Sequence, residues 1–231
     1  MPTFSVIILT AAPPTMAIEA GGAMVKIDGR EALLRSIDLF LNRDGVKQIL
    51  VVIPQDEMEE AKRRFGGHFG FAGVKLVAGG DRWIEQLSHA AEKLSPDATH
   101  VIVHDGARPA VPYSDIDAIL EASEKYPAVA MTTPLRTVLV EVDEGGNPMA
   151  YHLPDRFVHL LTPQSFSRAK FLELASTKRE THASEIHLLK GSPLNVRLGG
   201  QGDASMVRSL MAMLPRPKPK PSSSPFEEAQ W

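Results

Sequence analysis

The feature that most constrains the fold of this chain is a set of five short runs of apolar and β-branched residues. Each run is bounded by proline or glycine. Their continuous apolar character is typical of strands that are buried on both faces of a sheet. Segments in which apolar residues recur with helical spacing separate them. This alternation predicts βαβ units, and so an α/β fold with three layers around a mostly parallel sheet. The expected strands are 4–9, 48–53, 74–77, 100–103 and 129–132, and the expected helices are 32–41, 58–65, 83–94 and 113–125.

The segment 134–161 breaks this alternation. An extended stretch, 138–142, is followed by a Glu-Gly-Gly-Asn turn at 144–147 and by a second extended stretch that reaches Tyr151. This order predicts a β-hairpin arm, over about residues 135–160, that projects from the sheet. Because a lone hairpin cannot bury both of its faces, we expect the arm to bind a second copy of the chain and form a homodimer.

Charge and composition exclude several classes of partner. The chain has 25 lysines and arginines against 28 aspartates and glutamates, so it lacks the basic field that holds nucleic acid without sequence preference. It has no cysteine, so a metal would need oxygen or imidazole ligands. No apolar run approaches the roughly 20 residues that cross a membrane, and no basic leader precedes Lys26. We therefore expect a cytoplasmic protein with no membrane partner.

The composition changes sharply after Leu214. Prolines alternate with basic residues from Pro215 to Pro221, and three serines follow. Since alternating prolines disrupt helices and central strands, we expect residues 215–231 to form a flexible tail and residues 1–214 to form a single α/β domain. A peptide ligand for a proline-binding module is the alternative for this tail.

Ligands of such sheets bind beyond the carboxyl ends of the strands, so the residues that follow each strand are the first candidates for a site. Ala11 and Ala12 follow the first strand, where a nucleotide-binding protein would place a glycine-rich phosphate loop. Here Pro13 and Pro14 come next. Proline has no N–H group and cannot adopt a positive φ, so this segment is a poor phosphate nest.

Two later strand ends carry charged groups. The third expected strand leads into Gly79-Gly80-Asp81-Arg82, a tight turn that can bring backbone and a cation close to a ligand. After the fourth, Asp105 offers a carboxylate to Mg²⁺ and Arg108 can bind a phosphate, although a surface turn with a local ion pair is the alternative. Asp203 is a second candidate carboxylate much later in the chain.

In order and spacing, residues 3–210 resemble the 2-C-methyl-D-erythritol 4-phosphate cytidylyltransferase family and its close relative, ribitol-5-phosphate cytidylyltransferase. Residues 104–109, His-Asp-Gly-Ala-Arg-Pro, are similar to the most specific motif of the family, V-H-D-A-A-R-P. The turn 79–82 is similar to its G-G-x-x-R turn. Asp155-Arg156 resembles the Asp-Arg of its dimerisation arm, and the Thr-Pro-Gln at 162–164 resembles its T-P-Q.

The resemblance implies a fold of the nucleotide-diphospho-sugar transferase type with an arm that swaps across a homodimer. It implies that a sugar-alcohol phosphate attacks the α-phosphorus of CTP and releases pyrophosphate, with Mg²⁺ as cofactor, in isoprenoid-precursor synthesis. Position by position, it implies catalytic roles for Asp105, Arg108 and Arg156, a metal site at Asp105 and Asp203, and nucleotide or substrate contacts at Ala11, Ala12, Gly79, Gly80, Asp81, Arg82, Ala107 and Thr162.

Several departures from the family pattern fall on the expected phosphate path. The A-A-G-x-G-x-R-M segment loses both glycines and its arginine at residues 11–18, and the lysine of P-K-Q aligns with Gly22. A nucleotide-contacting serine becomes Glu85, and the N-I-K that follows the late aspartate becomes Ala-Ser-Met at 204–206. Lost donors and cations weaken catalysis at such a site.

Three functions therefore stay open. The chain is a cytidylyltransferase, or a catalytically impaired member that serves as a dimeric binding or scaffold protein, or a nucleotidyltransferase for another base or phosphosugar.

Overall fold

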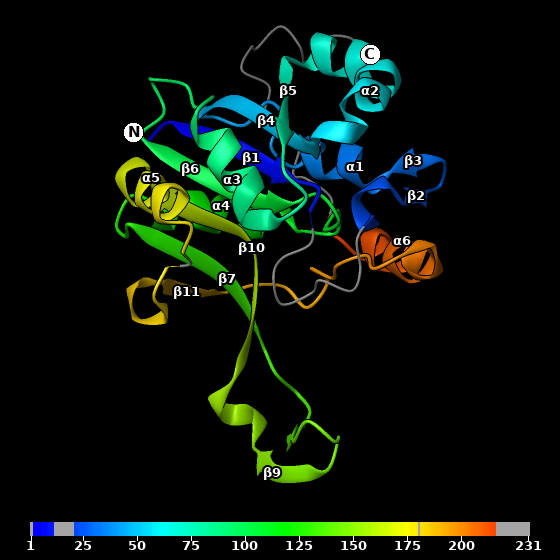
Figure 1. Cartoon of the computed structure of the whole chain (residues 1–231), viewed down its shortest axis with the longest axis vertical. Helices are drawn as coiled ribbons and strands as arrows, with labels where there is room; N and C mark the ends of the chain where they lie inside the picture. The colour runs from blue at the N-terminus through cyan, green and yellow to red at the C-terminus, as the bar shows by residue number, and fades with distance from the viewer. Residues whose placement is uncertain (1, 12–20, 180, 216–231) are drawn as a thin grey trace, which may run out of the picture.

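A seven-stranded sheet forms the centre of the protein (Figure 1). The computed structural model describes residues 2–11, 21–179 and 181–215. Neighbouring strands follow the order β11-β7-β10-β6-β1-β4-β5, and every pairing is parallel except those of β10 with β6 and β7. The strands are β1 (Phe4–Leu9), β4 (Val46–Pro54), β5 (Val74–Gly79), β6 (His100–Asp105), β7 (Ala128–Pro134), β10 (Val158–Ser167) and β11 (His187–Lys190).

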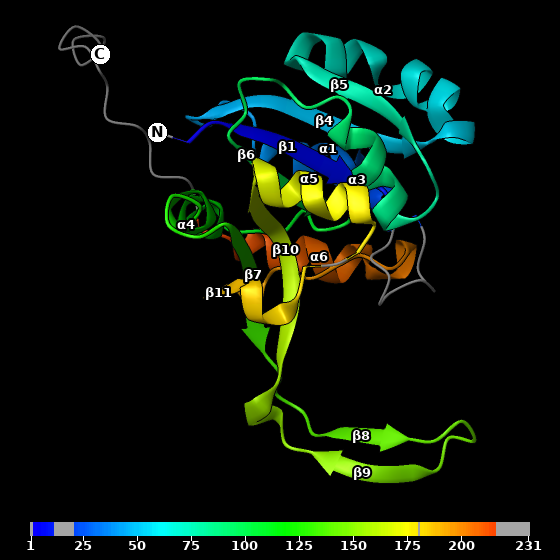
Figure 2. The ribbon, with the colours of Figure 1, turned by 60° about the vertical axis from the view of Figure 1, so that its left-hand side comes forward.

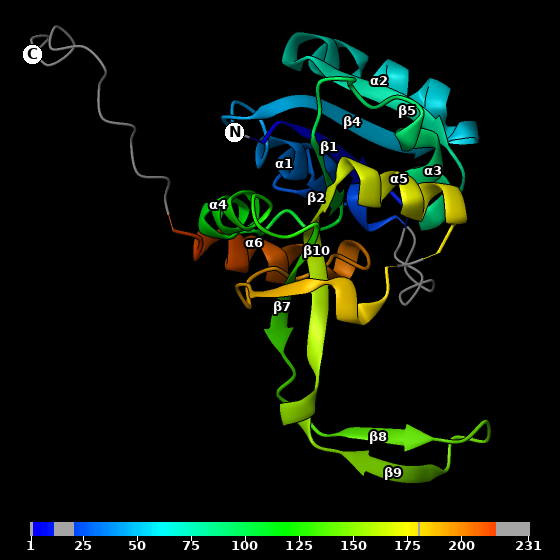
Figure 3. The same cartoon turned by 90° about the vertical axis from the view of Figure 1, so that its left-hand side faces the viewer.

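Helices cover both faces of this sheet and complete the three layers expected from the sequence. Alternate residues of β1 enter two different cores: Val6 and Ile8 pack with α1, α2 and α4, whereas Ile7 and Leu9 pack with α3 and α5. Figure 3 shows α3 and α5 together on their face of the sheet. The α-helices of the described residues are α1 (Ala32–Asp38), α2 (Met58–Ala72), α3 (Trp83–Ala91), α4 (Tyr113–Ala122), α5 (Arg168–Thr177) and α6 (Ala204–Ala212).

The predicted hairpin arm is present, as Figure 2 shows. Antiparallel strands β8 (Leu139–Val142) and β9 (Pro148–His152) form it, and they lie well away from the main sheet. Asp143 closes the hairpin, since its Oδ1 accepts hydrogen bonds from the amides of Gly145 (2.9 Å) and Asn147 (2.8 Å). Apolar side chains such as those of Val142 and Tyr151 are exposed along the arm. Dimerisation through this arm stays a prediction.

Several elements were not assigned from the sequence. In the second half of the chain they are β10, β11, α5 and α6, and in the first half they are the two strands of the hairpin β2 (Lys26–Ile27) and β3 (Arg30–Glu31). Strand β10 returns from the arm and inserts between β6 and β7, which makes it the one antiparallel member of the main sheet. Of the described helices, none is long and apolar enough to cross a membrane.

The expected tail begins at Pro215, the last described residue before the segment 216–231. That segment lies outside the described residues, as do Ala12, Pro13 and Pro14 of the expected nucleotide loop.

Candidate functional site

Asp105 lies at the carboxyl end of β6, paired in register with Leu9 at the end of β1. Its side chain is fully buried, and both oxygens are engaged. Oδ1 accepts a hydrogen bond from the amide of Ala107 (2.9 Å), and Oδ2 accepts one from Nε of Arg197 (2.8 Å). A second cation is near the same oxygen: Nε of Arg108 lies 3.7 Å from Oδ2. Two guanidinium groups therefore neutralise one buried carboxylate, which is the arrangement that a buried charge requires.

Arg108 is itself almost completely buried, with 5% of its surface exposed. Its Nη1 donates to the backbone oxygen of Asn195 (3.0 Å). Burial lowers the pKa of Arg108 below its ordinary value, Asp105 opposes that shift, and Arg197 adds to it. Its Nε has no hydrogen-bond partner in the described part of the chain. It lies within ion-pair distance of Asp105, so this guanidinium faces the buried carboxylate.

His104 and Thr162 link β6 to β10 behind the carboxylate. The amide of Asp105 donates to Oγ1 of Thr162 (3.1 Å), which lies 3.3 Å from Nδ1 of His104. Nε2 of His104 is 3.1 Å from the backbone oxygen of Arg108, which can only accept, so Nε2 carries the proton and Nδ1 accepts from Thr162. Complete burial lowers the pKa of His104 to about 3, so the ring is neutral. The chain of bonds fixes the backbone on either side of Asp105.

A cavity of about 380 Å³ opens beside this cluster. Its polar lining includes Arg108, Thr162 and Thr181, and the Oγ1 of Thr181 is buried without a hydrogen-bond partner among the described residues. Aliphatic and aromatic side chains form the remaining walls. They include Trp83, Ile84 and Leu87 of α3, Leu160, Leu161 and Phe166 of β10, and Leu174 of α5.

The expected nucleotide-contacting loops also meet at this edge of the sheet. Ala11 follows β1 and the Gly79-Gly80 turn ends β5, and one side chain joins them. The carboxamide of Gln86, on α3, accepts from the amides of Thr10 and Ala11, both at 3.1 Å, and donates to the backbone oxygen of Gly80 (3.1 Å). The structure thus brings together two stretches that the resemblance assigns to the nucleotide. Ala12 lies outside the described residues.

Arg82 does not turn toward these loops. Its Nε donates to Oε1 of Glu85 (2.8 Å), its Nη2 contacts the same oxygen, and its backbone amide donates to Oε2 (3.3 Å). Of these bonds, the one from the backbone amide of Arg82 to Glu85 caps the start of α3. Hydrogen bonds from Arg82 lower the pKa of Glu85, so a carboxylate stands over Gly80, next to the exposed Asp81.

The remaining predicted residues lie outside the Asp105 cluster. Oδ2 of Asp203 accepts from the amides of Gly199 (2.8 Å) and Gly200 (3.3 Å), so this carboxylate closes the turn that leads into α6. Arg156 is exposed at the base of the arm, in the short 3₁₀ helix Pro154–Arg156, away from the main sheet of its own chain.

A metal site formed by protein side chains does not fit this arrangement. Both oxygens of Asp105 are engaged, one of them by a guanidinium, and Asp203 binds backbone amides. In the described ranges, no group of three or more histidine, aspartate or glutamate side chains could hold a metal ion. An ion at this site would therefore need most of its ligands from elsewhere.

Sequence reasoning missed the residues that contact Asp105 and Arg108 from the far end of the chain. Besides the bonds already described, Nδ2 of Asn195 donates to the backbone oxygen of Thr162 (2.7 Å). A signal was present, since Asn195-Val196-Arg197 keeps the asparagine and the basic residue of the family motif N-I-K. The structure favours this match over Ala-Ser-Met at 204–206, which forms the first turn of α6.

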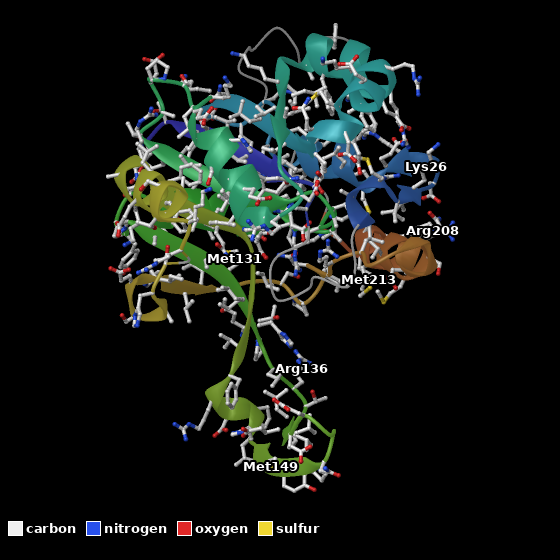
Figure 4. The ribbon with its side chains drawn as sticks, in the orientation of Figure 1. Lys26, Met131, Arg136, Met149, Arg208 and Met213 are labelled. Atoms are coloured by element: carbon white, nitrogen blue, oxygen red, sulfur yellow. The ribbon has the colours of Figure 1, made fainter. Side chains whose placement is uncertain are left out.

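The lysine that the family pattern predicts at Gly22 has no room there. A Cβ atom on Gly22 would overlap the backbone oxygen of Leu198 and lie 3.0 Å from Cβ of Ala107. Lys26 is on the outer β2–β3 hairpin (Figure 4), where it is 3.9 Å from Glu31. Arg136 is on the segment leading to the arm (Figure 4), so neither cation occupies the place of the family lysine.

Comparison with known proteins came from sequence and from structure. Residues 5–201 match the family model of 2-C-methyl-D-erythritol 4-phosphate cytidylyltransferase (IspD). The enzyme of that name from Bacillus pumilus is 22% identical over 220 residues, covering 89% of this chain and 96% of the relative. The one from Frankia casuarinae is 30% identical over 147 residues, which cover 63% of this chain but only 53% of that relative.

Solved structures show the same fold. The 4-diphosphocytidyl-2C-methyl-D-erythritol synthase of Anaerococcus prevotii superposes with a TM-score of 0.75 at 18% identity, covering 91% of this chain and 99% of the other. The corresponding Thermus thermophilus enzyme gives 0.69 at 20% identity, covering 89% and 98%. A CMP:2-keto-3-deoxy-manno-octonic acid synthetase complexed with CTP gives 0.64 at 15% identity, covering 91% and 99%. The expected nucleotidyltransferase type of α/β fold is confirmed.

Proposed function

We infer the function from the family, because this chain belongs to the 2-C-methyl-D-erythritol 4-phosphate cytidylyltransferases. We propose that it transfers CMP from CTP to 2-C-methyl-D-erythritol 4-phosphate and releases pyrophosphate, a step in the synthesis of isoprenoid precursors. The observation that carries the proposal is the buried Asp105, held between Arg197 and Arg108 beside a cavity at the carboxyl edge of the sheet.

The reaction needs positive charge more than covalent help. An oxygen of the acceptor phosphate attacks the α-phosphorus of CTP, the bond from that phosphorus to the bridging oxygen breaks, and pyrophosphate leaves with the electron pair. Negative charge gathers where the two phosphate groups meet, so preorganised cations lower the barrier. Arg108 and Arg197 would supply that charge. Asp105 would act on them by fixing both guanidinium groups in place.

The cavity is the proposed acceptor site. Arg108 and Lys178 are cations of its lining, and Oγ1 of Thr181 is buried there with no hydrogen-bond partner in the described ranges. Buried polar groups normally have partners, so this hydroxyl points to a polar ligand. A hydroxyl group of the acceptor would satisfy it, and the two cations would attract the acceptor phosphate.

Magnesium is proposed here only as a companion of the triphosphate. Such an ion offsets phosphate charge, and the phosphate oxygens would have to supply most of its ligands, because the described side chains do not fit a site held by protein alone. We assign no step of the reaction to it.

A homodimer is part of the proposal. The arm exposes apolar side chains on both strands, including Val140, Val142, Met149 and Tyr151. A second copy of the chain would cover them and would bring Arg156 to the acceptor phosphate of the partner's site. A cytoplasmic location stays a prediction from the sequence.

A binding or scaffold function is the second candidate, and two observations favour it. The guanidinium of Arg82 is paired with Glu85. The position at which the family has a lysine is Gly22 here, and a side chain there would overlap the backbone of Leu198. Both remove positive charge that a triphosphate would use. A nucleotidyltransferase for another base or phosphosugar is a weaker third candidate, because it too must hold a triphosphate.

Two measurements on the purified chain separate these functions. Isothermal titration with CTP, GTP and ATP in the presence of Mg²⁺ tests nucleotide binding, and release of pyrophosphate from CTP with 2-C-methyl-D-erythritol 4-phosphate tests turnover. We expect CTP to bind more tightly than the purine nucleotides and pyrophosphate to form. CTP binding without turnover would favour the scaffold, and failure of all three nucleotides to bind up to millimolar concentration would overturn the enzyme proposal.

A further inference from the structure

We propose that Gln86 is a positioning residue of the nucleotide site, which fixes Thr10 and Ala11 after β1 relative to the Gly79-Gly80 turn at the end of β5. This inference rests on the function proposed above. It concerns a residue that matches none of the family motifs and that sequence reasoning placed only on a helix.

The carboxamide of Gln86 is fully buried and bonds in both directions. Oε1 accepts from two consecutive amides, those of Thr10 and Ala11, each at 3.1 Å. Nε2 donates to the backbone oxygen of Gly80 at 3.1 Å and lies 3.4 Å from Oγ1 of Thr10. One side chain therefore satisfies two donors from one loop and an acceptor from another. Ala11 is buried, and Thr10 and Gly80 are half-buried. Backbone groups that water cannot fully reach are costly to leave unpaired, so the three groups take their positions from Gln86.

The surroundings hold Gln86 itself in place. The backbone amide of Arg82, the residue before α3, donates to Oε2 of Glu85 (3.3 Å), and Gln86 follows Glu85 in the first turn of that helix. Gly79 allows the helix to come close, since a Cβ there would lie 3.2 Å from Cγ of Gln86 and 2.5 Å from Cγ1 of Val52. The hydroxyl of Thr10 is also held, donating to the backbone oxygen of Val52 (2.9 Å).

The bridge matters because of what the loop after β1 lacks. The sequence has Pro13 and Pro14 where the family pattern has a glycine-rich segment, and proline offers no N–H group to a phosphate. The amides of Thr10 and Ala11, which Gln86 binds, come directly before that segment. If Ala11 and the 79–80 turn contact the nucleotide, the Gln86 bridge sets the distance between those contacts, and nucleotide binding depends on it.

The test compares Gln86→Leu with Gln48→Leu. Gln48 is a matched control, because Oε1 of Gln48 also accepts two bonds, from Ser5 Oγ (2.7 Å) and Ser95 N (2.8 Å), and its Nε2 donates to Lys93 O (2.9 Å). It does so at the amino end of β4 and β1, the opposite edge of the sheet. Leucine keeps most of the volume of glutamine in both variants and removes the bridge.

We expect Gln86→Leu to weaken CTP binding at least tenfold in isothermal titration, and to speed hydrogen exchange at the amides of Thr10 and Ala11. Gln48→Leu should bind CTP within twofold of the unchanged chain. If Gln86→Leu does not fold, Gln86→Glu serves in its place: it keeps the acceptor for both amides, so their exchange should stay slow, and it loses the donor to Gly80, so CTP binding should still weaken.

Three results would overturn the inference in different ways. If the unchanged chain binds CTP and the Gln86 variants bind it equally well, the positioning role is wrong and the proposed function stands. If the unchanged chain binds no nucleotide at all, the proposed function fails and the positioning role fails with it. An equal loss of affinity in the Gln48 and Gln86 variants would reduce Gln86 to a general support of the fold.

Discussion

Nε of Arg197 donates to Oδ2 of Asp105 across 2.8 Å, although the two residues are 92 positions apart in the chain. Both side chains are buried, and Nη1 of Arg197 also donates to the backbone oxygen of Leu198 (3.1 Å). The pair joins the carboxyl end of β6 to the segment that leads into α6. It therefore ties the most family-specific motif of the chain to a segment for which sequence reasoning proposed no role.

Replacing Arg197 should damage both stability and turnover. Arg197→Ala leaves Asp105 buried with Arg108 as its nearest cation, and breaking a buried ion pair from one side costs about 3–5 kcal/mol of unfolding free energy. Arg197→Lys keeps the charge and should lose less of both. Urea unfolding and pyrophosphate release measure the two effects. Arg208→Ala is the control, because its pair with Asp28 (3.1 Å) is exposed and such pairs contribute about 0–1 kcal/mol.

The buried His104 makes stability depend on pH. Its pKa is lowered by burial from 6.5 to about 3, so below pH 6.5 the unfolded chain takes up a proton that the folded chain refuses. Stability is therefore complete above pH 6.5 and is lost as the pH falls toward 3, by about 1 kcal/mol or slightly more per pH unit. Urea unfolding between pH 6.5 and 5 measures this slope. Burial also lowers the pKa of His100, which adds a smaller slope of the same sign.

The control for this effect is His104→Gln, which keeps a donor toward the backbone oxygen of Arg108 and cannot titrate. Its unfolding free energy should be lower at neutral pH but should change less between pH 6.5 and 5. Equal slopes in the two proteins would assign the pH dependence to other groups.

The central strands of the sheet were predictable from sequence because they are buried on both faces and read as continuous apolar runs. The expected strand 4–9 is β1 with the same bounds, and the expected strand 48–53 is the centre of β4. Strand β10 was not predicted because its sequence pattern is interrupted. Pro163 lies inside the strand, and the pairing with β7 shifts register between Leu161 and Gln164. Local sequence does not show that such a segment pairs antiparallel between two parallel strands.

The site was only partly predictable, for a related reason. Asp105, Arg108 and Thr162 stand in short motifs, so the resemblance found them. Gln86 binds Ala11, which is 75 residues away along the chain, and Arg197 binds Asp105, which is 92 residues away. No local sequence pattern reveals a partner at such a separation.

Restoring the lysine of the family at Gly22 should fail. Any side chain there must displace the backbone oxygen of Leu198, and that backbone is fixed because the amide of Leu198 donates to the backbone oxygen of Ala107 (2.9 Å). Gly22→Ala should therefore destabilise the fold by roughly 1–3 kcal/mol, as overpacking does, and Gly22→Lys by more. Gly200→Ala is the control, since no atom lies within 4 Å of a Cβ at that position. Thermal unfolding that is unchanged by Gly22→Ala would contradict the close packing.

Removing the carboxylate of Glu85, beside the 79–80 turn, should strengthen nucleotide binding. Glu85→Ser restores the residue type of the family pattern, releases Arg82 and removes a negative charge next to Gly80. We expect CTP to bind about tenfold more tightly at low salt, with a smaller gain at high salt because the effect is electrostatic. Isothermal titration at two salt concentrations measures it.

Glu59→Ser provides the comparison for this substitution. Glu59 forms an exposed pair with Lys62 (2.6 Å) on α2, with the same three-residue spacing, so its loss changes the net charge equally. An equal gain in CTP affinity from both variants would mean that net charge, rather than the position of Glu85, controls binding.

We expect different residues of the arm to serve dimerisation and substrate binding. Its exposed apolar side chains should hold two chains together, whereas Arg156 is exposed at its base and should contribute charge to the partner's site. Arg156→Ala should therefore remain a dimer in light scattering while its affinity for 2-C-methyl-D-erythritol 4-phosphate falls at least tenfold, the effect of about 1.4 kcal/mol. Arg63→Ala, on the exposed face of α2, should change neither property. A monomer for the unchanged chain would contradict the role of the arm, because Arg156 could then reach no second site.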